Sequence, residues 1–154
     1  MTGYLNQSDF NTVVRLAPLV SFDLIVRDAD NRVFLGLRNN EPAKDYFFVP
    51  GGIILKNEPL AAAFARIVKR EINYPGTLDE ARLLGIYDHF YEANAAGEPG
   101  YGTRYVVLAH EIRPRNPSTL AVDSQHREFG WWTEAEILSS DRVHDHTKAY
   151  FRTR

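Results

Sequence analysis

Residues 60–72 read LAAAFARIVKREI and carry the strongest helical pattern in the chain. At the α-helical period of about 100° per residue, Leu60, Phe64 and Ile67 share one face, which we expect to pack on the core. Pro59 suits the first turn of such a helix, because its fixed φ and its missing N–H are tolerated there. The segment therefore predicts an amphipathic helix that begins after Pro59.

One carboxylate interrupts the apolar face of this helix. Glu71 falls between Leu60 and Phe64 on the helical wheel and lies near the C-terminal end, where the helix dipole disfavours an anion. A buried charge is costly unless it is paired or binds a cation. Two interpretations remain open: Glu71 reaches past the edge of the core or pairs with an arginine such as Arg66, or it faces a cleft and holds a cation.

A second carboxylate and a glycine pair precede the helix. Glu58 stands thirteen residues before Glu71 and six after Gly52. We expect Gly51 and Gly52 to form a tight turn at which a backbone carbonyl can approach a ligand. Mg²⁺ prefers carboxylate and carbonyl oxygens, completed by water and substrate phosphates. The spacing therefore indicates an oxygen-lined cation site between this turn and the helix.

The flanking sequence alternates strand and helix signals. A short helix is expected over residues 10–16, capped by Ser8 and Asp9 and ended by Pro18. Strands are expected at residues 19–27, 33–38, 47–49, 82–92, 103–112 and 128–132, with a loop at 93–102, a capping box at 133–136 and a last helix at 143–152. This order predicts an α/β or α+β fold, a mixed sheet between helices, in a single domain over residues 1–154.

The composition excludes several classes of protein. Of 154 residues, 44% are hydrophobic and 25% charged, which is typical of one globular domain. Eighteen Lys and Arg against 20 Asp and Glu give a net charge of −2, so no basic field exists to hold nucleic acid. No apolar stretch approaches the roughly 20 residues of a membrane span, and no secretion signal is recognisable. The absence of cysteine excludes thiolate chemistry and fits a cytoplasmic location.

With these features in place, the segment from Gly52 to Tyr74 resembles the Nudix hydrolase box, G-x5-E-x7-R-E-U-x-E-E-x-G-U, where U is apolar. Most of its fixed positions match, but two glutamates and the second glycine are missing. The matches are Gly52, Glu58, Arg66, Val68 and Glu71, with Tyr74 a loose match, and the departures are Ile67, Arg70 and Asn73.

Sequences that look like GDP-mannose mannosyl hydrolases, a branch of the Nudix superfamily, share this incomplete box. The resemblance extends over residues 8–26, 35–52, 87–92, 103–112, 124–126 and 139–151. It implies a Nudix-type mixed sheet sandwiched between helices, and a homodimer in which the segment near Phe10 contacts the partner. One departure is Ile53, where the branch commonly has an arginine that stabilises charge near the diphosphate.

The resemblance also implies a reaction and its residues. The expected reaction is hydrolysis of GDP-mannose, or a related GDP-hexose, to GDP and free sugar by inverting attack at the anomeric carbon. One Mg²⁺, or Mn²⁺ in its place, is expected. The implied roles are His126 as general base, Gly51, Glu71 and Gln125 as metal ligands, Arg38 and Arg66 at the diphosphate, Tyr105 as a support for the leaving group, and Asp23 and His89 near the sugar.

Other interpretations of the same residues stay open. Arg66 can instead form a structural ion pair, with Glu71 in particular, and Glu58 can hold Arg66 or the loop rather than the metal. Tyr105 can belong to the core. His144 and His146, two residues apart, are expected to point opposite ways on a helix and to be solvated or structural. At the level of function, the alternatives are a Nudix enzyme that attacks phosphorus and a catalytically weak module that binds nucleotide sugars.

Overall fold

The computed structural model describes residues 4–41, 43–117, 120 and 126–152, and of residues 126 and 127 the backbone alone. The first helix, α1 (Gln7–Leu16), begins earlier than expected because its N-cap is Asn6 rather than Ser8 or Asp9. The Asn6 side chain accepts a hydrogen bond from the backbone N–H of Asp9 at 2.8 Å. The helix ends before Pro18, as predicted.

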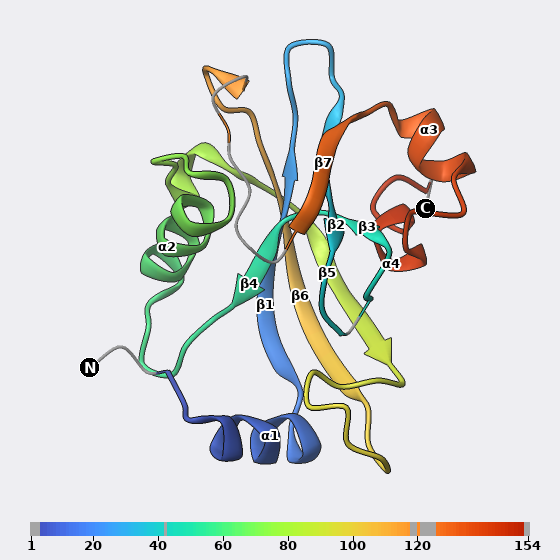
Figure 1. The fold of residues 1–154 in the computed structure, drawn as a ribbon. Helices are drawn as coiled ribbons and strands as arrows, with labels where there is room; N and C mark the ends of the chain where they lie inside the picture. The colour runs from blue at the N-terminus through green and yellow to red at the C-terminus, as the bar shows by residue number, and fades with distance from the viewer. Residues whose placement is uncertain (1–3, 42, 118–119, 121–125, 153–154) are drawn as a thin grey trace.

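Two sheets form the centre of the described residues (Figure 1). One sheet has the order β4-β1-β6-β5 and is mixed, because β1 runs parallel to β6 while the other neighbours are antiparallel. The second sheet has the order β3-β2-β7 and is antiparallel. The strands are β1 (Leu19–Val26), β2 (Val33–Arg38), β3 (Phe47–Phe48), β4 (Gly51–Ile53), β5 (Arg82–Tyr91), β6 (Thr103–Ile112) and β7 (His126–Trp132).

Side chains of β1 alternate between two core regions. Phe22 and Leu24 point toward α2 (Leu60–Ile72), where they pack with Phe64 and Ile67. Ile25 points the other way, into the apolar layer shared with the second sheet. Figure 1 shows α2 on one side of the sheets and α3 (Glu134–Ser139) and α4 (Asp145–Lys148) on the other. The predicted α/β architecture of mixed sheet and helices is confirmed.

Helix α2 has the predicted bounds, with Pro59 as its N-cap and Asn73 in the left-handed conformation after its last residue. One detail of the predicted face is wrong, because Leu60 is 50% exposed. The buried side of α2 begins at Ala63 and Phe64, so the first residue of the helix lies outside the packed interface.

The last part of the chain departs from the expected helix at 143–152. Val143 forms an isolated bridge with Phe47, and His144 is extended and caps the four-residue α4. Its Nδ1 accepts a hydrogen bond from the backbone N–H of His146 at 3.0 Å. The capping box that opens α3 is present with both of its hydrogen bonds, between Thr133 and Glu136. Among the described residues, no helix has the length and apolar character needed to cross a membrane.

The 3₁₀ helix η1 (Leu78–Glu80) connects α2 to β5 and was not expected from the sequence. A capping box between Thr77 and Glu80 holds it, in the same way as the box at α3. This short turn contacts α2, so it fixes where the long strand β5 enters the sheet.

Candidate functional site

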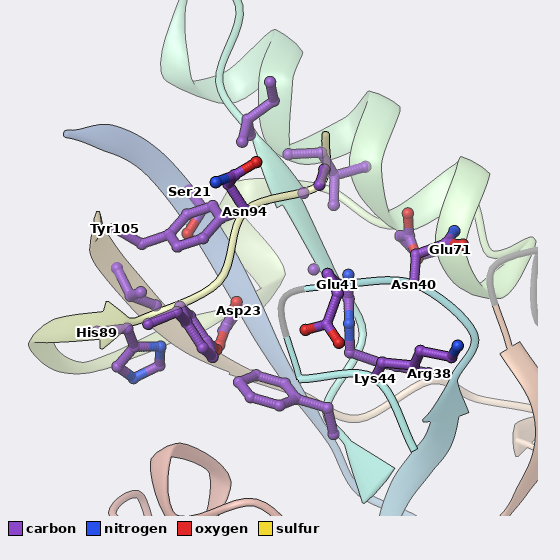
Figure 2. Close-up of a pocket in the computed structure, with 18 of the residues that line it drawn as sticks. Ser21, Asp23, Arg38, Asn40, Glu41, Lys44, Glu71, His89, Asn94 and Tyr105 are labelled. Carbon is purple, nitrogen blue, oxygen red and sulfur yellow. The ribbon is translucent and has the colours of Figure 1, made fainter. Parts of the chain in front are cut away.

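A pocket of about 700 Å³ opens between the mixed sheet, α2 and the loop that follows β2 (Figure 2). Seven of the nine residues predicted for the site line it, although they come from five strands and one helix. They are Asp23, Arg38, Gly51, Arg66, Glu71, His89 and Tyr105. A volume of this size lies within the range of about 300–1,000 Å³ found for small-molecule sites.

Glu71 is the carboxylate that α2 contributes to the pocket. Its exposed fraction is 5%, so the structure supports the interpretation in which Glu71 is buried rather than the one in which it reaches past the edge of the core. Figure 2 shows Glu71 on the side of the pocket formed by α2, apart from Asp23 and His89. The pocket has therefore one acidic side at the end of α2 and another polar side on the strands β1 and β5.

Arg66 has Glu58 as its ion-pair partner. Its Nε and Nη2 donate to the two carboxylate oxygens of Glu58 at 2.6 and 3.0 Å. Nη2 also donates to the backbone carbonyl of Ile53 at 2.8 Å, and Glu58 accepts from the N–H of Leu55. The hydrogen bond from Arg66 lowers the pKa of Glu58. Of the alternatives left open, the structure therefore supports the one in which Glu58 holds Arg66 and the loop.

Gly51 and Gly52 lie in strand β4 and not in a tight turn, so that expectation was wrong. Gly51 pairs with Asp23 of β1 in antiparallel register. A Cβ atom at Gly51 would stand 2.5 Å from the carbonyl oxygen of Phe22 and 2.6 Å from Oδ1 of Asp23. Glycine is required here because β4 passes close to β1, which brings the backbone of Gly51 against the Asp23 carboxylate.

Asp23 is buried, with an exposed fraction of 7%, and accepts a short hydrogen bond from the hydroxyl of Tyr150. Burial raises the pKa of Asp23 to about 7, although the Tyr150 hydrogen bond and the charge of Arg38 oppose this change. Two residues earlier on the same face of β1, Ser21 is also buried and lines the pocket. Within the described part of the chain its Oγ has no hydrogen-bond partner.

His89 and Asp23 both contact the hydroxyl of Tyr150, and the Tyr150 oxygen lies 3.3 Å from Nε2 of His89. Burial lowers the pKa of His89 to about 3, and the neighbouring charges of His146 and His144 act in the same direction. The ring is therefore neutral at physiological pH. It stacks on the ring of His146 with a centroid distance of 4.2 Å and an interplanar angle of 5°.

The prediction that His144 and His146 point opposite ways was wrong. Their ring centroids are 4.7 Å apart, and both rings contact Tyr91. The helical wheel does not apply to this pair, because His144 is the extended N-cap of α4 and only His146 lies in the helix. Their interpretation as structural residues is supported, since burial lowers the pKa of both rings and Nε2 of His146 lies 3.1 Å from the Phe90 carbonyl oxygen.

Arg38 and Tyr105 also belong to the polar lining. Arg38 is the last residue of β2, and Figure 2 shows its side chain with Lys44 and Glu41 of the following loop. Tyr105 pairs with His89 in the register of β5 and β6. Burial raises the pKa of the Tyr105 phenol, so the side chain stays protonated at neutral pH.

The two remaining predicted residues belong to the segment before and at the start of β7. Gln125 lies outside the described residues. His126 opens β7, where its backbone is the register partner of Arg38. This pairing brings the chain at His126 to the strand end that carries Arg38, and the roles of both residues stay predictions.

The pocket contains oxygen donors of the kind that hard cations bind. Among the described residues, no group of three or more His, Asp or Glu side chains is arranged to hold a metal ion. Glu71 supplies one buried carboxylate, and Gly51 lines the same pocket. Because Mg²⁺ is commonly held by one or two carboxylates plus water and substrate phosphates, this donor set fits Mg²⁺.

Sequence reasoning missed Tyr150, Tyr91 and Asn94 as parts of the pocket region. Tyr150 bonds to Asp23 from 127 residues away, while Tyr91 and Asn94 line the pocket. The side chain of Asn94 closes its own loop through bonds to Glu98 and to the carbonyl of Tyr101. Tyr150 does lie inside the resembling segment at 139–151, so that segment was the available signal.

A comparison with protein-family models matches residues 17–153 to the NUDIX domain. The chain belongs to the Nudix hydrolase family. Among curated proteins, the low-salt glycan biosynthesis protein Agl8 of Haloferax volcanii is 34% identical over 128 residues, which are 83% of this chain and 79% of that protein. This similarity extends well beyond the Nudix box.

Solved structures agree with the fold. The MutT protein from Methanosarcina mazei Go1 superposes with a TM-score of 0.68 at 16% identity, over 87% of this chain and 91% of that one. The NUDIX domain of Shewanella oneidensis NrtR, solved with ADP ribose, has a TM-score of 0.65 at 16% identity over 96% of each chain. At these identities the likeness establishes the Nudix fold.

Proposed function

We propose that this Nudix protein is a Mg²⁺-dependent hydrolase that cleaves GDP-mannose, or a related GDP-hexose, to GDP and free sugar. Attack occurs at the anomeric carbon with inversion. The observation that carries the proposal is that one pocket brings together Asp23, Arg38, Glu71, His89 and Tyr105. These are the residues that the resemblance to GDP-mannose mannosyl hydrolases assigns to the sugar, the diphosphate and the metal.

The diphosphate lies at the α2 side of the pocket in this proposal. Glu71, the Gly51 carbonyl and Gln125 would hold the cation, and the guanidinium of Arg38 would bind phosphate oxygens, for which its planar donors are suited. Mg²⁺ held there would supply Lewis-acid chemistry, since it would neutralise charge on the diphosphate leaving group. Arg66 contributes indirectly, because its bonds to Glu58 and Ile53 fix the loop between β4 and α2.

The sugar lies against Asp23 and His89. The pKa of His89, near 3, makes this ring a poor general base at neutral pH, since an effective base has a pKa near the operating pH. A neutral ring can still exchange hydrogen bonds with sugar hydroxyl groups. We therefore keep His126 as the proposed base and give His89 a binding role.

The Haloferax relative supports a nucleotide-sugar substrate through its name, which refers to glycan biosynthesis. Glycans are assembled from activated sugars, so a hydrolase in such a process would meet nucleotide sugars. The incomplete Nudix box also supports a single cation, because Ile67 and Arg70 replace two carboxylates. Attack on phosphorus and a binding-only module remain the competing functions.

Hydrolysis in ¹⁸O-water separates these three functions. We expect the label in the released mannose and none in GDP, with the inverted anomer visible by ¹H NMR in the first minutes. Label in the nucleotide product would establish attack on phosphorus. Absence of turnover across a panel of GDP-, ADP- and UDP-sugars, together with measurable binding of one of them, would establish the binding module. The variant Glu71→Gln is expected to have no turnover. Wild-type protein is expected to lose its turnover when excess EDTA is added.

We also propose a homodimer, as the family resemblance implies. Ile86 and Phe90, which share one face of the edge strand β5, are 64% and 63% exposed, and Leu16 of α1 is 67% exposed. Exposed apolar side chains of this size are typical of contact surfaces when they gather in one patch. Light scattering coupled to gel filtration tests the proposal, since a mass near 17.6 kDa would contradict it.

A further inference from the structure

The hydroxyl of Tyr150 lies between two polar groups of the pocket. It donates to Oδ2 of Asp23 and is 3.3 Å from Nε2 of His89. Tyr150 belongs to the segment after α4, is 9% exposed, and packs its ring edge-to-face on Tyr87 with centroids 4.8 Å apart. The phenol is therefore fixed by packing as well as by its two polar neighbours.

The direction of these hydrogen bonds follows from the number of protons. A phenol has a single proton to donate, and above the pKa of Asp23, about 7, where that carboxyl is ionised, Tyr150 gives it to Asp23. The contact between the Tyr150 oxygen and Nε2 of His89 then requires the imidazole to be the donor. A neutral His89 that donates from Nε2 carries no proton on Nδ1, so Nδ1 has a lone pair and is an acceptor.

The surroundings of His89 hold the plane of its ring. His146 stacks on it at 4.2 Å, and the ring of Phe48 approaches with a centroid distance of 6.1 Å. These contacts restrict tilting of the imidazole but do not choose between its two tautomers. The hydroxyl of Tyr150 is the group that makes this choice.

We propose that Tyr150 is a positioning residue that orients the Asp23 carboxylate and fixes the proton of His89 on Nε2. The pocket then presents two hydrogen-bond acceptors, the carboxylate and Nδ1, to hydroxyl groups of the sugar. This proposal rests on the proposed function, which places the sugar against Asp23 and His89. Tyr150 is not among the residues that line the pocket, so in this proposal it acts through its two partners.

The test begins with a measurement that needs no substrate. Tyr150→Phe keeps the ring and removes the hydroxyl, and Tyr74→Phe is the matched control, because the Tyr74 hydroxyl lies 3.5 Å from Glu80 and outside this pocket. The measurement records the imidazole ¹⁵N signals of the chain's five histidines in labelled, metal-free protein at pH 8.5 and assigns the signal of His89 with a His89→Gln variant. We expect wild type and Tyr74→Phe to show His89 with the proton on Nε2, and Tyr150→Phe to show a mixture of tautomers.

The second measurement tests whether the orientation of Asp23 and His89 contributes to recognition of the sugar. Tyr150→Phe is expected to lower kcat/KM for GDP-mannose at least tenfold, while its Kd for GDP stays within twofold of wild type. Tyr74→Phe is expected to change neither quantity. A Kd for GDP that weakens as much as kcat/KM falls would indicate general damage to the pocket and would overturn the proposal.

The two proposals fail in different ways. Unchanged His89 signals in Tyr150→Phe, or a wild-type proton on Nδ1, overturn the role of Tyr150 whatever the enzyme does. Wild-type protein that turns over no GDP-sugar overturns the proposed function, and the sugar-directed part of this inference with it. A changed tautomer combined with unaltered kinetics overturns the positioning role alone.

Discussion

Asp23→Asn is expected to make the protein more stable at alkaline pH while it lowers activity. Asp23 is buried, and burial raises the pKa of its carboxyl from the ordinary 3.8 to about 7. The folded protein therefore resists ionisation of this group. Asparagine keeps the shape of the side chain and an oxygen that can accept from Tyr150, but it carries no charge at any pH.

The sign of the effect follows from the protons bound in each state. Between pH 3.8 and about 7 the unfolded chain has lost the Asp23 proton and the folded protein has kept it. The unfolded state binds fewer protons in this window, so the contribution of Asp23 to stability falls as the pH rises. Over the whole window the fall is about 4 kcal/mol, and it is complete above the folded pKa.

The assay is urea unfolding followed by the fluorescence of the two tryptophans, in metal-free buffer at several pH values from 4 to 8.5. We expect the stability of Asp23→Asn relative to wild type to increase by about 4 kcal/mol across this range. The pKa values of His89 and His144 are lowered in the folded protein, so these residues act in the opposite direction: their contribution to stability is lost as the pH falls. Both proteins contain these histidines, so their contribution largely cancels in the difference.

Asp88→Asn is the matched control, because the Asp88 side chain is 61% exposed and pairs with Arg104 at the surface. Its effect should stay within about 1 kcal/mol at every pH. Parallel stability curves for wild type and Asp23→Asn would refute the reasoning, since they would mean that the buried carboxyl titrates alike in the folded and unfolded states. A difference that grows toward acid pH would refute it as well.

Two further predictions concern groups near the pocket. Glu58→Gln removes the ionic partner of Arg66 and should lower the free energy of unfolding by about 2 kcal/mol. Glu98→Gln, on the loop before β6, is the exposed control. Equal chemical denaturation midpoints for wild type and Glu58→Gln would contradict a stabilising role of the Glu58–Arg66 pair. Ser21→Ala removes a buried hydroxyl that has no partner within the described residues, so thermal unfolding should show no loss of stability while the KM for the GDP-sugar rises about tenfold. A lower melting temperature with an unchanged KM would instead make Ser21 a structural residue.

Local sequence signals predicted most of the regular structure. The bounds of α2, β2 and β6 match those expected. Helical periodicity and runs of β-branched residues depend only on residues that are close in the sequence, so they can be recognised without the tertiary structure. The capping box at Thr133 was predicted for the same reason, since its hydrogen bonds join residues three apart. Where the local signal was weak, as in the last helix, the predicted bounds were too wide: His144 is extended, and the helix spans only Asp145–Lys148.

The sequence by itself placed Glu71 on the same helix face as Phe64 and Ile67, because the angular position of a residue on a helix depends on the chain alone. Only the tertiary structure decided that this carboxylate is buried, because burial depends on the segments that pack around it. The tertiary structure alone decided the partners of the charged groups. Arg66 pairs with Glu58 rather than Glu71, and Tyr150 reaches Asp23 across 127 residues. Ion pairs and hydrogen bonds act over a few ångströms, so their partners are set only when packing brings distant segments together.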